Sequence, residues 1–190
     1  MKRIAASVPC LKIPAWALME RQLIKAMDES VHPFLAKYTR EDGTLFWRDP
    51  STGRCSEDDL YESFYNWPLL YLMGGGDHLL PLAHRQWEAM TRQLTAFGAC
   101  YKEYGRGTDA FHQGEGDMFF YLLCLADPRD PSNIERARRF AGLYLNEDPE
   151  APNYDPQLKL VRAPRTGAAG PAPAFLGREP SYGWSPGMRR

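Results

Sequence analysis

The sequence has no cysteine pair at metal-binding or redox spacing, no apolar run long enough to cross a bilayer, and almost no net charge. Its four cysteines stand 45, 45 and 24 residues apart, which indicates neither a zinc site nor a disulfide framework, so we expect no metal and no cofactor. The longest apolar run, Met118 to Ala126, has nine residues, whereas a spanning helix needs about 20. A net charge of −1 over 190 residues argues against a general nucleic-acid binder, which needs a basic surface.

The sequence predicts neither a secretion signal nor a phosphate-binding loop. Pro9 and Lys12 interrupt the apolar stretch behind the basic start of the chain, which no longer fits a signal peptide. The glycine run 74–76 lacks the Lys-Ser/Thr of a phosphate loop and predicts the end of a helix. We therefore expect a cytoplasmic protein that binds neither membrane nor nucleic acid.

Proline and glycine are concentrated at the C-terminal end. They make up 31% of residues 149–190, against 13% of residues 1–148. Proline removes a backbone donor and glycine costs backbone entropy, so such a stretch resists helix and sheet. We expect a helical-hairpin domain over 10–148 and, over 149–190, a long irregular loop followed by a disordered tail.

Within residues 10–148 apolar side chains recur every three or four positions, which is typical of helices. No segment has a convincing β pattern, so the predicted fold class is all-α. A helix almost wholly apolar around residues 118–125 is expected to be buried. The predicted helices begin near Pro14, run from Ser56 to Met73, from His78 to Tyr104, from Glu115 to Leu125, and from Asn133 to Leu145.

Two segments resemble each other at an offset of 50 residues. Tyr71–Asp77 aligns with Tyr121–Asp127, and Pro81 aligns with Pro131. Each unit is predicted to be a short buried helix, a tight turn and a longer amphipathic helix. Helical hairpins that repeat in this way bury their faces on their neighbours and form a solenoid or a closed ring.

Two polar clusters, 57–67 and 111–117, stand at the start of the two predicted inner helices, and the offset pairs Glu62 with His112. Glu62 with Glu115, or Glu62 with Asp117, would form a carboxylate pair of the kind that cleaves glycosidic bonds. Flanking aromatic residues would raise the pKa of one carboxyl by desolvation. His112 would carry a proton or bind a sugar. A purely structural role is as well supported for Glu62, Glu115 and His112.

Several further residues are candidate substrate contacts. Aromatic faces stack on sugar rings, and an arginine pairs with a substrate carboxylate, although a core position or a solvated loop is the alternative explanation for each. The candidate substrate-binding residues are Trp47, Tyr61, Asn66, Arg106 and Asp117.

Three strings carry a resemblance to a known family: 61–71 with 74–77, 112–115, and 138–144 with 147–155. They resemble the six-hairpin (α/α) toroid carbohydrate-active enzymes, with glycoside hydrolase family 154 (β-glucuronidase-like) as the nearest group, over about residues 41–170. The resemblance implies a hydrolase acting on uronic-acid-containing glycans, an acidic oligosaccharide or polysaccharide as partner, and Glu62, His112 and Glu115 lining the cleft.

The length departs from that family. A ring of six hairpins at this spacing needs roughly 300 residues, so we expect an incomplete toroid of about three hairpins, equivalent to the N-terminal half of a larger enzyme. Its uncovered inner helix faces would favour self-association. The alternatives are a lyase or isomerase of the linalool dehydratase-isomerase type on the same fold, a non-catalytic helical-repeat binding module, and an inactive fragment.

Overall fold

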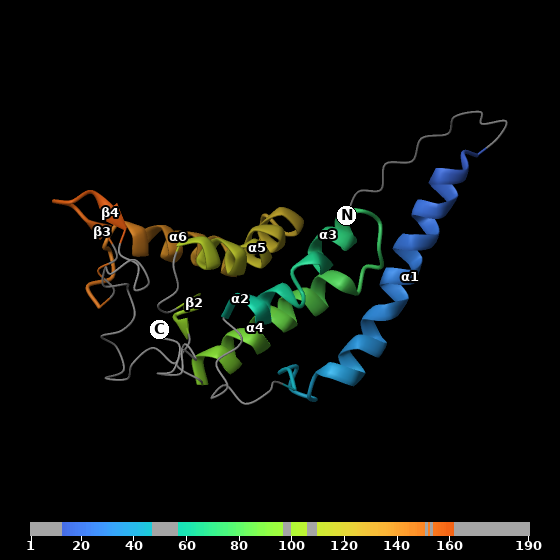
Figure 1. Ribbon diagram of the computed structural model, residues 1–190, viewed down its shortest axis with the longest axis horizontal. Helices are drawn as coiled ribbons and strands as arrows, with labels where there is room; N and C mark the ends of the chain where they lie inside the picture. The colour runs from blue at the N-terminus through green and yellow to red at the C-terminus, as the bar shows by residue number, and fades with distance from the viewer. Residues whose placement is uncertain are drawn as a thin grey trace, which may run out of the picture.

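The computed structural model describes residues 13–46, 57–96, 100–105, 110–150, 152 and 154–161, excluding the side chains at 57–59, 101, 104–105, 110–113 and 161. The described chain is mostly helical, which confirms the all-α class (Figure 1). None of its helices is both long and apolar enough to span a bilayer. The helices are α1 (Ala15–Tyr38), α2 (Glu57–Glu62), α3 (Asn66–Leu72), α4 (Leu79–Ala96), α5 (Ala110–Ala126) and α6 (Pro131–Tyr144).

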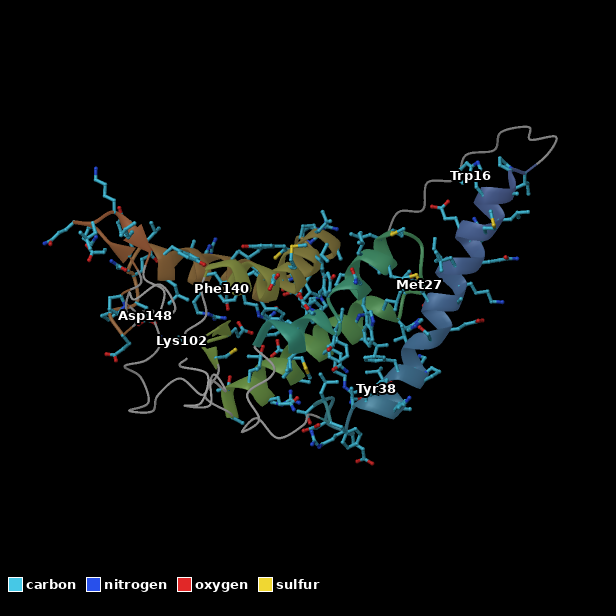
Figure 2. The ribbon with its side chains drawn as sticks, in the orientation of Figure 1. Trp16, Met27, Tyr38, Lys102, Phe140 and Asp148 are labelled. Atoms are coloured by element: carbon cyan, nitrogen blue, oxygen red, sulfur yellow. The ribbon has the colours of Figure 1, made fainter. Side chains whose placement is uncertain are left out.

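Helix α1 begins directly after Pro14, as predicted. Its C-terminal half is covered, because Val31 is buried and packs with Leu70 and Leu79 of the following helices. Its N-terminal half extends away from the other helices, and Trp16 projects from it, whereas Met27, also exposed, lies at the middle of the helix (Figure 2). The apolar face of α1 is therefore buried at one end only.

The helix predicted from Ser56 to Met73 is broken in two. Helices α2 and α3 are separated by a turn at 63–65, and Phe64 and Trp67 donate to carbonyls three residues back, those of Tyr61 and Phe64. Pro68 explains the break, because its ring would clash with the carbonyl of Phe64 in a continuous helix. Proline is tolerated within the first turn of α3, where it lies instead.

The prediction of a helix from His78 to Tyr104 is also wrong at its end. Helix α4 stops at Ala96, and β1 (Cys100–Tyr101) and β2 (Tyr104–Gly105) form a hairpin. Lys102 and Glu103 at its turn have φ angles of 46° and 70°, a left-handed conformation that ordinary residues rarely adopt. The side chains of both residues contact distant parts of the chain: Lys102 pairs with Asp148, and Glu103 accepts from Trp87 and Arg139.

A second small hairpin lies in the segment predicted to be irregular. Strands β3 (Tyr154–Asp155) and β4 (Leu160–Val161) pair in antiparallel register. The side chain of Asn146 fixes the hairpin to the end of α6, accepting from the amide of Tyr154 at 2.8 Å and donating to its carbonyl at 2.6 Å. The predicted tail beyond residue 161 lies outside the described residues.

The 50-residue offset is visible in which residues are buried. Helices α3 and α4 form one helix–turn–helix unit, and α5 and α6 form the next (Figure 1). The predicted order of a short helix followed by a longer one holds in the first unit, where α3 has 7 residues and α4 has 18, but is wrong in the second, where α5 has 17 and α6 has 14. Four buried positions of α4 recur in α6 at this offset: Ala83 with Asn133, Gln86 with Arg136, Met90 with Phe140, and Gln93 with Leu143.

Each of these two helices, α4 and α6, also holds a turn that lies earlier in the chain. In the first unit, Arg85 and Arg92 of α4 donate to the carbonyls of Glu41 and Asp42 at 2.6 and 2.7 Å. In the second, Arg139 of α6 donates to the carbonyl of Lys102 at 3.1 Å. In both units the second helix therefore anchors an earlier loop through arginine, at positions that the 50-residue offset does not pair.

The core between the units is aromatic. Tyr61 and Trp87 stack with ring centroids 4.5 Å apart, and Phe119 meets Trp87 edge-on at 5.6 Å. Phe140 of α6, labelled in Figure 2, packs edge-on against Phe120 at 5.0 Å. Such aromatic pairs add roughly 0.5–1.5 kcal/mol each beyond the area they bury.

Candidate functional site

The two polar clusters predicted from the sequence lie on neighbouring helices. The first covers α2 and the start of α3, and the second occupies the first half of α5. Both α2 and α3 pack against α5. Among the described residues of these clusters, Glu62, Asn66, Glu115 and Asp117 are the candidate site residues that are at least partly exposed, and Ser63 and Tyr65 are accessible beside them.

The two carboxyls of α5 point in different directions. Glu115 and Asp117 are two residues apart, so about 200° of helix rotation separates them, and both are half-buried. Only one of them can face Glu62, which is exposed at the last position of α2. The two predicted pairs are thus mutually exclusive.

Asp117 has the environment expected of a proton donor. Burial raises the pKa of its carboxyl from 3.8 to about 6, because the charged form is poorly solvated. Among the side chains that the structure describes, none is found donating a hydrogen bond to it that would offset this shift. Asp117 therefore combines partial protonation near neutral pH with a half-exposed position.

Tyr61 is a correction to the predicted set. Its ring is 3% exposed and stacks on Trp87, and its hydroxyl is 2.8 Å from the Thr91 hydroxyl. Burial raises the pKa of this hydroxyl well above its ordinary value. A ring enclosed in this way holds α2 against α4 and does not reach a substrate.

The remaining predicted residues divide into two groups. Asn66 is exposed at the first position of α3, where its amide is accessible. The backbone of His112 belongs to α5, but its side chain lies outside the description. Trp47 and Arg106 also lie outside the described residues.

Tyr121 is the residue that the sequence analysis missed. Helix α5 was predicted to be buried on nearly all sides, yet Tyr121 is 55% exposed, and Met118 and Leu125 beside it are exposed as well. These positions recur at three- and four-residue intervals and so share one face, which could have been recognised from their spacing. Tyr121 follows Asp117 by one helical turn, and the Asp117 charge is among the causes that raise the pKa of its hydroxyl, after burial.

In the described part of the chain, this region does not bring together three side chains of the kinds that ligate metals. The thiols offer no alternative there, since Cys100 is buried and Cys124 lies toward the far end of α5. Burial also raises the pKa of the Cys124 thiol, which disfavours the thiolate that metals bind. The groups available for chemistry are therefore carboxyls flanked by an aromatic surface.

These observations define an all-α protein built from repeated helix–turn–helix units. The chain belongs to the family described as a domain of unknown function (DUF8034), whose model matches residues 3–190. Comparison with curated proteins finds no match. Comparison with solved structures likewise finds none.

Proposed function

We propose that this chain is a carbohydrate-active helical-repeat protein that hydrolyses uronic-acid-containing glycans at the face formed by α2, α3 and the first half of α5. The observation that carries the proposal is the carboxyl of Asp117, whose pKa burial raises to about 6. Glycoside hydrolysis requires one carboxyl to be protonated near neutral pH while a second is ionised. The larger (α/α) toroid is part of this proposal, supported by the repeated units.

The roles follow from the environments of the side chains. Asp117 donates the proton to the leaving oxygen, and Glu62, exposed on α2, is the carboxylate that activates water or attacks the sugar. Glu115, on the other flank of α5 from Asp117, is the alternative carboxyl partner of Glu62. His112 serves as the proton carrier. Tyr121 offers an aromatic face on which a sugar ring stacks.

The test is a turnover screen with 4-nitrophenyl β-glucuronide and oligouronides. Because Asp117 must be protonated, kcat/KM is expected to fall as the pH rises above about 6. Asp117→Asn keeps the shape of the side chain but cannot donate the proton, so it should lower kcat/KM by about 10²–10⁴-fold. Glu62→Gln should abolish turnover with helical content intact.

Two variants separate a role in chemistry from a general disturbance. Asp77→Asn replaces an exposed aspartate in the turn before α4 and should leave turnover unchanged. Tyr121→Ala should raise KM more than it lowers kcat, because stacking contributes to binding. Absence of turnover on every uronide, or full activity of Asp117→Asn, would refute the hydrolase.

A second candidate function is a binding module without chemistry, and the exposed apolar face of α1 favours it. Trp16 and Leu23 are 65% and 61% exposed and lie on one side of the helix. Contiguous apolar surface of this kind is typical of protein contacts. Light scattering coupled to size-exclusion chromatography distinguishes this function: self-association that Trp16→Ser and Leu23→Ser abolish, together with no turnover, would support a module.

A further inference from the structure

Each turn between paired helices is tied to an earlier helix by one histidine and one aspartate. His78, at the end of the α3–α4 turn, has its Nε2 3.3 Å from Oδ1 of Asp28 in α1. His84 of α4 has its Nε2 3.6 Å from Oδ2 of Asp127, in the α5–α6 turn. Each pair joins the turn inside one unit to a helix that precedes that unit. The histidine lies in the turn in the first pair, whereas the aspartate lies in the turn in the second.

Each pair has a third ligand-type side chain beside it: His32 stacks on His78 with ring centroids 5.2 Å apart, and Asp130 lies beside the second pair. Asp130 follows Asp127 by three residues, and the donor atoms of His84, Asp127 and Asp130 all lie within 4.8 Å of one another. The offset of 50 residues places Leu80 at the corresponding position of the first unit. Oδ1 of Asp28 also accepts from the amide of Gly76 at 3.3 Å, and the Nε2 of His78 is buried without a hydrogen-bond partner among the described residues. The difference between the two places is that only the second, in the described part of the chain, brings three donor atoms of ligand type this close together.

The imidazole of His84 is not satisfied by the described protein groups around it. Its Nε2 is buried and has no hydrogen-bond partner in the described part of the chain. The 3.6 Å separation from Asp127 exceeds hydrogen-bond distance. It is close to the separation of about 3.4 Å between two ligands that each lie about 2.1 Å from a tetrahedral metal.

Asp130 can take part without giving up its structural role. It is the N-cap of α6, and its Oδ1 accepts from the amides of Ser132 and Asn133 at 2.7 and 3.3 Å. Those bonds use one carboxylate oxygen, and the other remains to bind a cation.

We propose that His84, Asp127 and Asp130 bind one first-row divalent cation of the Zn²⁺, Mn²⁺ or Fe²⁺ class. One imidazole nitrogen and two carboxylate oxygens are a ligand set that these ions accept, and two carboxylates balance the charge of the ion. The bound ion fastens α4 to the turn between α5 and α6. The site is separate from the proposed glycan site, since Asp127 follows Asp117 by ten residues, about 15 Å along a helix.

The test is a titration of the metal-stripped chain with Co²⁺, an optical substitute for these ions. We expect about one Co²⁺ bound per chain, with d–d absorption typical of nitrogen and oxygen ligands. Asp130→Asn keeps the N-cap, because asparagine caps helices as well as aspartate does, but removes the free carboxylate oxygen. It should weaken Co²⁺ binding at least about tenfold, and His84→Ala should do the same.

Two matched controls isolate the cluster. Asp42→Asn changes a similar motif, in which the carboxylate accepts from the amide and hydroxyl of Thr44 at 2.9 and 2.7 Å, but Asp42 belongs to no group of three ligand-type side chains among the described residues. His78→Ala removes the equivalent histidine of the first unit. Both controls should bind Co²⁺ within about twofold of the wild type, and far-UV circular dichroism checks that every variant folds.

Three results would overturn the proposal. They are the absence of Co²⁺ binding to the wild type, unchanged binding by a folded Asp130→Asn variant, and thiolate-to-cobalt charge-transfer absorption, which would assign the ion to cysteine. The measurement needs no glycan substrate, so its outcome is independent of the proposed hydrolase.

Discussion

Replacing Arg136 with methionine tests what holds the β1–β2 hairpin against α6. The Arg136 side chain is 8% exposed, and its Nε donates to Oε1 of Glu103 at 2.8 Å, while another nitrogen donates to Glu88. Glu103, 13% exposed, also accepts from Trp87 Nε1 at 3.0 Å and from Arg139. Methionine keeps much of the apolar volume of the arginine stem but none of the donors.

The expected cost comes from breaking a buried ion pair on one side only. Removing one partner of such a pair costs about 3–5 kcal/mol, because the other charge is left buried. Trp87 and Arg139 still donate to Glu103, and Glu88 is largely exposed, so the lower end, about 3 kcal/mol, is expected. For a chain of this size, that loss lowers Tm by about 6–12 °C.

Urea unfolding followed by far-UV circular dichroism measures this loss of unfolding free energy. Arg138→Met is the matched control, because Arg138 is exposed on the same helix and its replacement should change stability by less than about 0.5 kcal/mol. A loss under about 1 kcal/mol for Arg136→Met, or an equal loss for the control, would show that the network does not anchor the hairpin.

Three further predictions concern stability. Burial raises the pKa of Asp117 in the folded chain from 3.8 to about 6, so folding takes up a proton between pH 3.8 and about 6. The contribution of Asp117 to the unfolding free energy therefore falls as the pH rises through this range. Asp117→Asn should remove this fall, which urea unfolding from pH 4 to 7.5 measures. Gly114→Ala should raise the unfolding free energy by about 0.5–1 kcal/mol, because a Cβ there meets nothing within 4 Å inside α5, and chemical denaturation measures it. Leu79→Ala should lower the unfolding free energy by about 2–5 kcal/mol, since Leu79 is fully buried. Leu23→Ala, on the exposed face of α1, should change the unfolding free energy by less than about 0.5 kcal/mol.

Each of these three stability predictions has an outcome that would contradict it. Equal pH dependence of wild type and Asp117→Asn would mean that this carboxyl is solvated in the folded state. Destabilisation by Gly114→Ala would mean that the space beside α5 is filled. A large cost for Leu23→Ala would mean that the N-terminal half of α1 is covered in solution.

Local sequence signals predicted most of the helices. The start of α1 follows from Pro14 and a three- and four-residue apolar spacing, and α6 begins at Pro131 after its N-cap Asp130, within two residues of the predicted start. The break between α2 and α3 has a local cause in Pro68, which acts on a carbonyl only four residues away, but α1 continues through Pro33, so a proline marks a candidate break without deciding it. These features depend on short-range sterics and hydrogen bonds, which neighbouring residues determine.

The hairpin at residues 100–105 depends on distant residues. Its turn carries Lys102 and Glu103, with neither the glycine nor the asparagine that such a turn favours. Glu103 is held by Trp87 of α4 and by two arginines of α6, and Lys102 pairs with Asp148 at 2.7 Å; Figure 2 labels both residues of this pair. A sequence window around the turn contains none of these partners.

The features of the candidate sites also divide into those that the sequence predicts and those that the tertiary structure decides. The sequence alone indicated carboxyls near the start of α5 and the 50-residue repeat, because residue type and spacing are local properties. The raised pKa of Asp117, the burial of Tyr61, the exposure of Tyr121 and the meeting of His84 with Asp127 were decided by the tertiary structure. Solvation and proximity depend on which helices pack together, and that packing joins residues far apart in the chain.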